Sequence, residues 1–180
     1  KGAIPEAFFT GLAGRDAAPL SAEMLIKFQY IALIPTRATN FRYHLYKDGR
    51  LFLARNSAEE NNPIYNTPLP PEPQRILPAD VLGAIRAALK AEQFFQQPPF
   101  WEVRARGGAL MIISARRGRQ VHEVWYVNTC TPLTDLLFSL AVEPPAAQSA
   151  EDQQAALEMI LADQKRELAK LQQELGVSEE

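Results

Sequence analysis

The sequence predicts an α+β fold, in which two β-hairpin regions form an antiparallel sheet with helices packed on one face. Polar and apolar residues alternate over 26–30, which is typical of a half-buried strand. Apolar residues then recur at helical spacing over 79–95, and prolines stand on both sides of this segment. The same order, strands followed by a helix, returns over 101–142. An amphipathic helix is predicted to follow at the C-terminal end.

The first hairpin is predicted around the Asp-Gly pair at 48–49. This pair fits a two-residue turn, because both central positions need a positive φ that Asp and Gly tolerate. Counted outward from such a turn, Leu45 faces Phe52 and Tyr43 faces Ala54 on the neighbouring strand.

The second β region is predicted to begin with a hairpin at the Gly-Gly pair 107–108. This pair separates an apolar-alternating strand at 101–106 from another at 109–115, so that Val103 would pair with Ile112.

The next turn is predicted at Gly118. A three-residue loop with Gly118 in the left-handed conformation would place Val124 and Tyr126 on the face of Leu110 and Ile112. Because the apolar pattern sets the register of paired strands, this loop length is preferred.

The predicted organisation has four parts. An N-terminal arm over 1–24 drapes on the surface and precedes an α+β domain over 25–143, whose last helix starts at Thr131 as N-cap. A linker of small residues and prolines at 144–150 leads to an amphipathic or coiled-coil-like helix over 151–176.

The composition is that of a globular protein, with 47% hydrophobic and 22% charged residues in 180. The net charge is −2, but residues 151–180 hold three basic and eight acidic residues, which leaves the first 150 residues at +3. This small excess argues against a large nucleic-acid footprint. The longest apolar runs are too short to span a bilayer.

Catalytic and metal-binding motifs are not found in the sequence, which has no phosphate-binding glycine loop, zinc-protease motif or calcium loop. A Cys nucleophile at Cys130, with His122 as base and Asp135 as orienting carboxylate, is the best catalytic candidate. Cysteine is more often a buried structural residue, so we predict no catalytic residue. His44 and His122 lie on separate strands, so no metal and no cofactor are predicted. One cysteine fits either redox compartment, which leaves localisation open.

A basic and aromatic sheet face suggests an alternative function in nucleic-acid binding. Guanidinium groups hold phosphates while aromatic rings stack on bases. The residues predicted to display this chemistry are Arg104, Arg106, Trp125, Arg117 and Arg119.

A leucine seam in the C-terminal helix is the predicted partner-binding surface. Its members are Leu157, Leu161, Leu168, Leu171 and Leu175, spaced by fours and threes when Gln164 is included. The seam either packs back on its own domain or pairs with a protein partner, including a second copy of this chain. The sequence therefore predicts a non-enzymatic interaction or self-association module, with nucleic-acid binding as the alternative and a Cys130-dependent hydrolase or transferase as the least favoured reading.

Overall fold

The computed structural model describes residues 14–32, 40–57, 64–103 and 108–142, together with Glu60, Ala162 and Arg166. The chain divides into two units, residues 1–142 and 143–180. In the second unit Ala162 and Arg166 are helical and exposed. The predicted linker at 144–150 and all five seam leucines lie outside the described residues.

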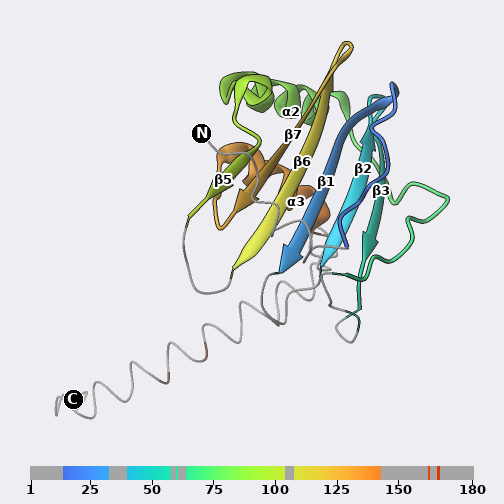
Figure 1. Cartoon of the computed structure of the whole chain (residues 1–180). Coiled ribbons are helices and arrows are strands. Elements are labelled where there is room, and N and C mark those ends of the chain that lie inside the picture. The colour runs from blue at the N-terminus through green and yellow to red at the C-terminus, as the bar shows by residue number, and fades with distance from the viewer. Residues whose placement is uncertain are drawn as a thin grey trace, which may run out of the picture. The chain divides into compact units, whose positions relative to one another are not determined.

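The first unit is built on a seven-stranded sheet, which confirms the predicted α+β class (Figure 1). The strand order is β4-β3-β2-β1-β6-β7-β5, and every neighbouring pair is antiparallel except β5 and β7. The strands are β1 (Met24–Ala32), β2 (Phe41–Tyr46), β3 (Arg50–Arg55), β4 (Arg75–Ile76), β5 (Phe100–Glu102), β6 (Ala109–Arg117) and β7 (Gln120–Val127).

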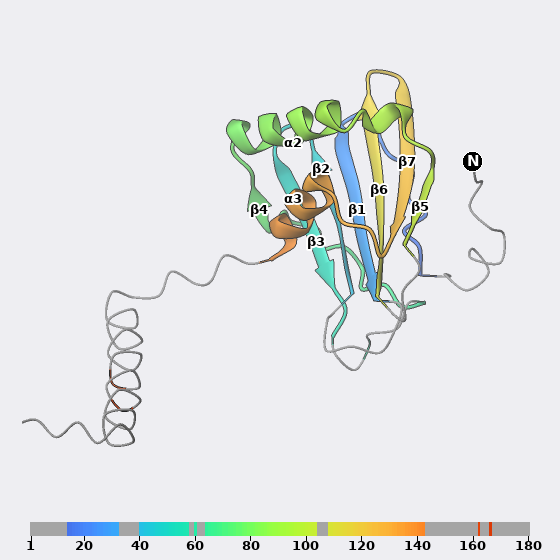
Figure 2. The same ribbon diagram turned by 90° about the vertical axis from the view of Figure 1, so that its left-hand side faces the viewer.

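Helices α2 (Ala79–Ala91) and α3 (Pro132–Ala141) cover one face of this sheet, and Figure 2 shows α3 in front of the strands and α2 across their upper ends. Their buried residues, such as Ile85 and Leu137, form one core cluster with Phe28, Tyr43 and Ile113 of the sheet. The α2 helix ends at Ala91, four residues earlier than predicted, and a 3-10 turn, η1 (Phe94–Gln96), follows it. None of the helices among the described residues is long and apolar enough to cross a membrane.

The α3 helix begins as its sequence predicts. Thr131 is the N-cap, Pro132 is the first helical residue, and the side chains of Thr131 and Thr134 close a capping box.

The opposite face of the sheet is also covered in part. A second cluster of buried residues, including Ile31, Ile112 and Trp125, lies on this face. Residues 14–20, which we call the N-terminal strap, lie against it and are drawn in blue in Figure 1. The predicted arm thus includes the strap, and its last residue, Met24, is already the first residue of β1.

The predicted register of the first hairpin is wrong by one residue. Leu45 pairs with Leu51 and Tyr43 with Leu53, so the loop has three residues, 47–49, instead of two. This register places four apolar side chains on the face that packs against the helices. They are Tyr43, Leu45, Leu51 and Leu53, which alternate with residues of the other face along each strand.

The predicted loop of the β6–β7 hairpin is wrong as well, because it is one residue too long. Ile112 pairs with Trp125 and Arg117 with Gln120, which leaves a two-residue loop with Gly118 at φ +60°. Val124 and Tyr126 therefore face the helices, away from Ile112. Because both faces of this strand pair are buried, the apolar pattern could not show which set belongs to which face.

The predicted hairpin between 101–106 and 109–115 is also wrong. β5 pairs in parallel with β7, where Trp101 lies opposite Tyr126. β6 lies between β1 and β7, so neither of its edges is left for β5. Pairing between β1 and β6 joins segments about eighty residues apart, which local sequence patterns do not reveal.

Gly49 provides a test of this architecture. Its φ is +94°, and a Cβ atom there would lie 2.4 Å from the carbonyl oxygen of Leu77. We expect Gly49→Ala to lower the free energy of unfolding by about 1–3 kcal/mol, because the strained backbone and the clash add. Urea denaturation followed by circular dichroism measures the change.

Gly83→Ala is the matched control. Gly83 lies in α2 with open space around the position of a Cβ, so this variant should gain up to about 1 kcal/mol. Equal effects of the two substitutions would contradict the close contact at Gly49.

Candidate functional site

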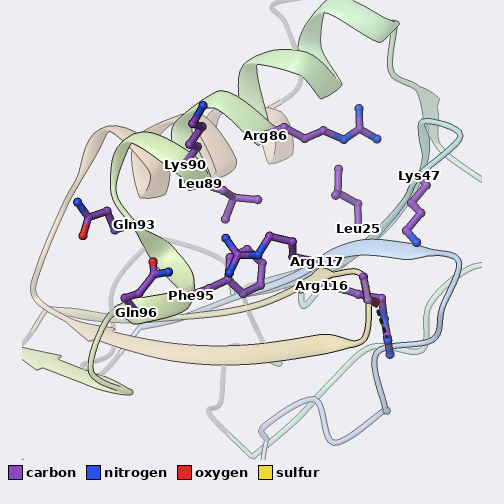
Figure 3. A pocket seen from close by; sticks show the side chains of 11 residues that line it. Leu25, Lys47, Arg86, Leu89, Lys90, Gln93, Phe95, Gln96, Arg116 and Arg117 are labelled. Carbon is purple, nitrogen blue, oxygen red and sulfur yellow. Dashed lines mark hydrogen bonds between the residues drawn. The ribbon is translucent and has the colours of Figure 1, made fainter.

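A cavity of about 850 Å³ lies between α2, the β2–β3 turn and the tip of the β6–β7 hairpin (Figure 3). Its apolar lining comes from Leu25, Leu89 and Phe95. Four cationic side chains surround this lining, and we call the whole the cationic pocket. They are Lys47, Arg86, Lys90 and Arg117.

Helix α2 supplies three of the residues that line the pocket. Arg86, Leu89 and Lys90 stand at i, i+3 and i+4, which brings their side chains together on the helix surface. Leu89 is buried, while the two cations are exposed. Figure 3 shows Arg86 and Leu89 reaching from α2 toward the space above the hairpin.

The hairpin tip supplies Arg117, whose position is held by two contacts. Its guanidinium lies over the Phe95 ring, 4.6 Å from the centroid, and its Nη2 donates to Gln120 Oε1 at 3.0 Å. Stacking of this kind orients the guanidinium plane and leaves its outer edge available.

Arg116 also lines the pocket, but its guanidinium is already bound elsewhere. Its Nε donates to Ser21 O at 3.1 Å and its Nη2 to Leu20 O at 2.6 Å. Arg116 therefore ties the hairpin tip to the strap region, whereas Arg117 remains with the pocket. No carboxylate among the described residues lines the cavity, so its field is positive.

A second cluster of ionisable groups lies on the other face of the sheet, around Asp16 of the strap. Asp16 Oδ2 is 2.9 Å from Arg42 Nη1 and 2.6 Å from His44 Nε2. Lys27 Nζ lies 3.8 Å from Asp16 Oδ1 and donates to the backbone carbonyl of Asp16 at 3.0 Å. Gln29 completes the cluster, because its Oε1 accepts from the Asp16 amide at 2.7 Å.

The charges of this cluster compensate one another. Burial acts to raise the pKa of Asp16, but the hydrogen bond with His44 and the charge of Lys27 outweigh it and hold that pKa well below its usual value. Burial lowers the pKa of Lys27, against the attraction of Asp16. Asp16 and His44 are 8% and 6% exposed, and the adjoining space of about 10 Å³ holds one water molecule at most. The cluster is therefore a structural anchor without room for a substrate.

Glu123 forms a neighbouring anchor. It accepts hydrogen bonds from Ser114 Oγ at 2.7 Å and Trp125 Nε1 at 2.9 Å, and it pairs with Arg15 of the strap. Burial acts to raise the pKa of Glu123, but these hydrogen bonds and Arg15 lower it below the usual value. The Arg15 guanidinium lies over the Trp125 ring, 5.5 Å from the centroid.

This arrangement corrects the predicted nucleic-acid face. Trp125 is 0% exposed, because the strap covers it, so its ring is not displayed for stacking on a base. Arg117 belongs to the opposite face of the sheet and Arg119 is exposed at the hairpin tip. Arg104 and Arg106 lie outside the described residues.

The three residues of the catalytic alternative are not brought together. Cys130 is exposed in the loop before α3. His122 lies near the other end of β7, where its Nε2 is 2.9 Å from Gln97 O. The strand from 122 to 127 alone spans about 17 Å. Asp135 is exposed on α3, and the described residues contain no group of three metal-binding side chains.

The sequence reasoning did not find the cationic pocket or Asp16. The spacing of Arg86, Leu89 and Lys90 was a local signal for part of the pocket, but Lys47 and Arg117 join it only through the sheet. No local sequence pattern marked Asp16, because its partners lie on the later strands β1 and β2.

No family model matches the sequence, and no curated protein matches it.

The Asp16 cluster makes a stability prediction. Asp16→Asn leaves Lys27, Arg42 and His44 without their anion, so the free energy of unfolding should fall by about 3–5 kcal/mol at neutral pH. Because folding depresses the pKa of Asp16 below its usual value near 3.8, its stabilisation is complete above that value and is lost as pH falls below it. The wild-type protein should therefore lose stability from about pH 5 to pH 2 more steeply than the variant, in urea denaturation at each pH.

Asp80→Asn is the control for this variant. Asp80 is exposed in the first turn of α2, so its loss should change stability by less than about 1 kcal/mol. The anchor role is refuted if Asp16→Asn matches this control in stability and matches the wild type in pH dependence.

Proposed function

We propose that this protein is a non-enzymatic interaction module that self-associates through the leucine seam of residues 157–175. Another protein with a matching helix is the second form of the same proposal. The observation that carries the proposal is that the described residues of the first unit bury apolar side chains on both faces of their sheet.

Buried side chains lie on both faces of the sheet. The helix-covered face buries large side chains such as Tyr43 and Ile85, which are 0% exposed. The strap covers Trp125 on the opposite face and anchors there through Asp16 and Glu123. The first unit therefore has a core of its own among its described residues.

The apolar content of the seam favours association. Each leucine removed from water contributes about 1.5–3 kcal/mol, and the seam carries five of them at coiled-coil spacing. Helices with this pattern are stable when a second helix covers the seam. A second copy of the chain always supplies one.

The described ionisable groups support binding over catalysis. The Asp16 cluster has no space for a substrate, and Cys130 and His122 are far apart. The open cavity has cations and apolar groups, which bind ligands but supply no nucleophile paired with a base. Nucleic-acid binding is the weaker alternative, because Trp125 is covered.

Light scattering tests the proposed association. The full chain of 20.1 kDa should have at least about twice this molar mass at micromolar concentration, and a chain ending at Ala150 should be monomeric. Leu161→Asp combined with Leu168→Asp should have the same effect as truncation, because each charge would be buried in the seam.

Ala162→Asp is the matched control, since Ala162 is helical and exposed outside the seam. It should leave the molar mass unchanged. An equal molar mass for the full chain and the truncated chain would contradict self-association, and a lowered melting temperature in that case would show the seam packing on its own domain.

A further inference from the structure

We infer that the cationic pocket binds a small organic phosphate, in which a phosphate monoester is attached to an apolar chain or ring. The inference adds a ligand to the proposed interaction module, and it does not depend on the leucine seam. It rests on three features of the pocket: its charge, its apolar lining and its volume.

The charge of the pocket favours an anionic ligand. Four cations line it, although the whole chain has a net charge of −2. The first 150 residues carry an excess of only three positive charges. The cations of the pocket are therefore a local cluster and not part of a generally basic surface. Like charges held together repel each other, and an anion between them relieves this repulsion.

Three of the cations are available to a ligand. The side chains of Lys47, Arg86 and Lys90 are exposed and make no hydrogen bond or ion pair with another described residue. Arg116 is the informative contrast, because its guanidinium already donates to backbone carbonyls.

The mixture of side chains suits a phosphate group. A guanidinium donates two parallel hydrogen bonds to two phosphate oxygens, while an ammonium acts as a mobile point charge. Arg117 is stacked on Phe95, which reduces the freedom that it loses on binding. A dianionic phosphate monoester can accept hydrogen bonds from several such groups at once.

The apolar lining favours a ligand with an apolar group over a bare phosphate. Leu25 and Leu89 are buried in the pocket floor and Phe95 is half-buried beside them. The volume of about 850 Å³ falls in the range of sites for organic ligands, roughly 300–1,000 Å³. Inorganic phosphate would leave the apolar lining uncovered, whereas an attached chain or ring would bury it.

Isothermal titration calorimetry on the full chain at low ionic strength tests the inference with three probes: inorganic phosphate, phenyl phosphate and hexyl phosphate. At least one organic phosphate should bind about tenfold or more tightly than inorganic phosphate, because its apolar group covers the lining. Tighter binding of phenyl phosphate would identify a ring-bearing ligand, and tighter binding of hexyl phosphate would identify a chain-bearing ligand. Either order supports the inference.

Substitutions locate the binding site. Arg86→Ala and Lys47→Ala should each weaken binding of the better organic probe by about tenfold, because each removes a charge-assisted hydrogen bond. Arg119→Ala is the matched control: it removes a cation exposed at the same hairpin tip that does not line the pocket, and it should change affinity less than about twofold. Thermal unfolding of each variant verifies that the exposed substitutions leave the fold intact.

Three outcomes would overturn the inference. They are the failure of all three probes to bind, equal affinities for inorganic and organic phosphates, and an Arg119→Ala loss as large as that of Arg86→Ala. The seam variant that combines Leu161→Asp with Leu168→Asp should leave probe affinity unchanged, and Arg86→Ala should leave the molar mass unchanged. Failure of the ligand inference is thereby separated from failure of self-association.

Discussion

The buried carboxylate of Asp16 is the interaction on which the second face of the sheet depends. Lys27 and Gln29 on β1 stand opposite His44 and Arg42 on β2, so this face carries polar and cationic groups beside the sheet's centre. Such groups are costly to bury without a partner of opposite charge. Asp16 supplies that charge from a segment outside the sheet and is itself stabilised as an anion.

The strap connects this anchor with the hairpin tip. Arg15 covers Trp125 beyond one side of the Asp16 cluster, and Arg116 holds the carbonyls of Leu20 and Ser21 at the other end. Neighbouring residues of β6 point to opposite faces, so fixing Arg116 on the strap side directs Arg117 to the helix side. The same hairpin therefore closes one face of the sheet and contributes a cation to the pocket on the other.

The division of roles between the two ionisable clusters follows from solvent access. In the Asp16 cluster, opposite charges are paired and the side chains are largely buried, so the groups stabilise the fold. In the cationic pocket, charges of one sign surround an open, partly apolar cavity, so these groups are suited to bind an anion. The positions of charged residues along the chain do not distinguish the Asp16 cluster from the cationic pocket, because both are assembled from distant segments.

Local patterns in the sequence were enough to predict the α+β class, the strands around 26–30, the α2 and α3 helices, and the positive φ of Gly118, since periodicity and turn chemistry act over a few residues. They failed for the β2–β3 and β6–β7 registers and for β5, where both faces are buried or the partner strand is remote. The pocket and the Asp16 anchor arose only on folding, because β1, β2, α2 and the hairpin tip meet through contacts between residues dozens of positions apart.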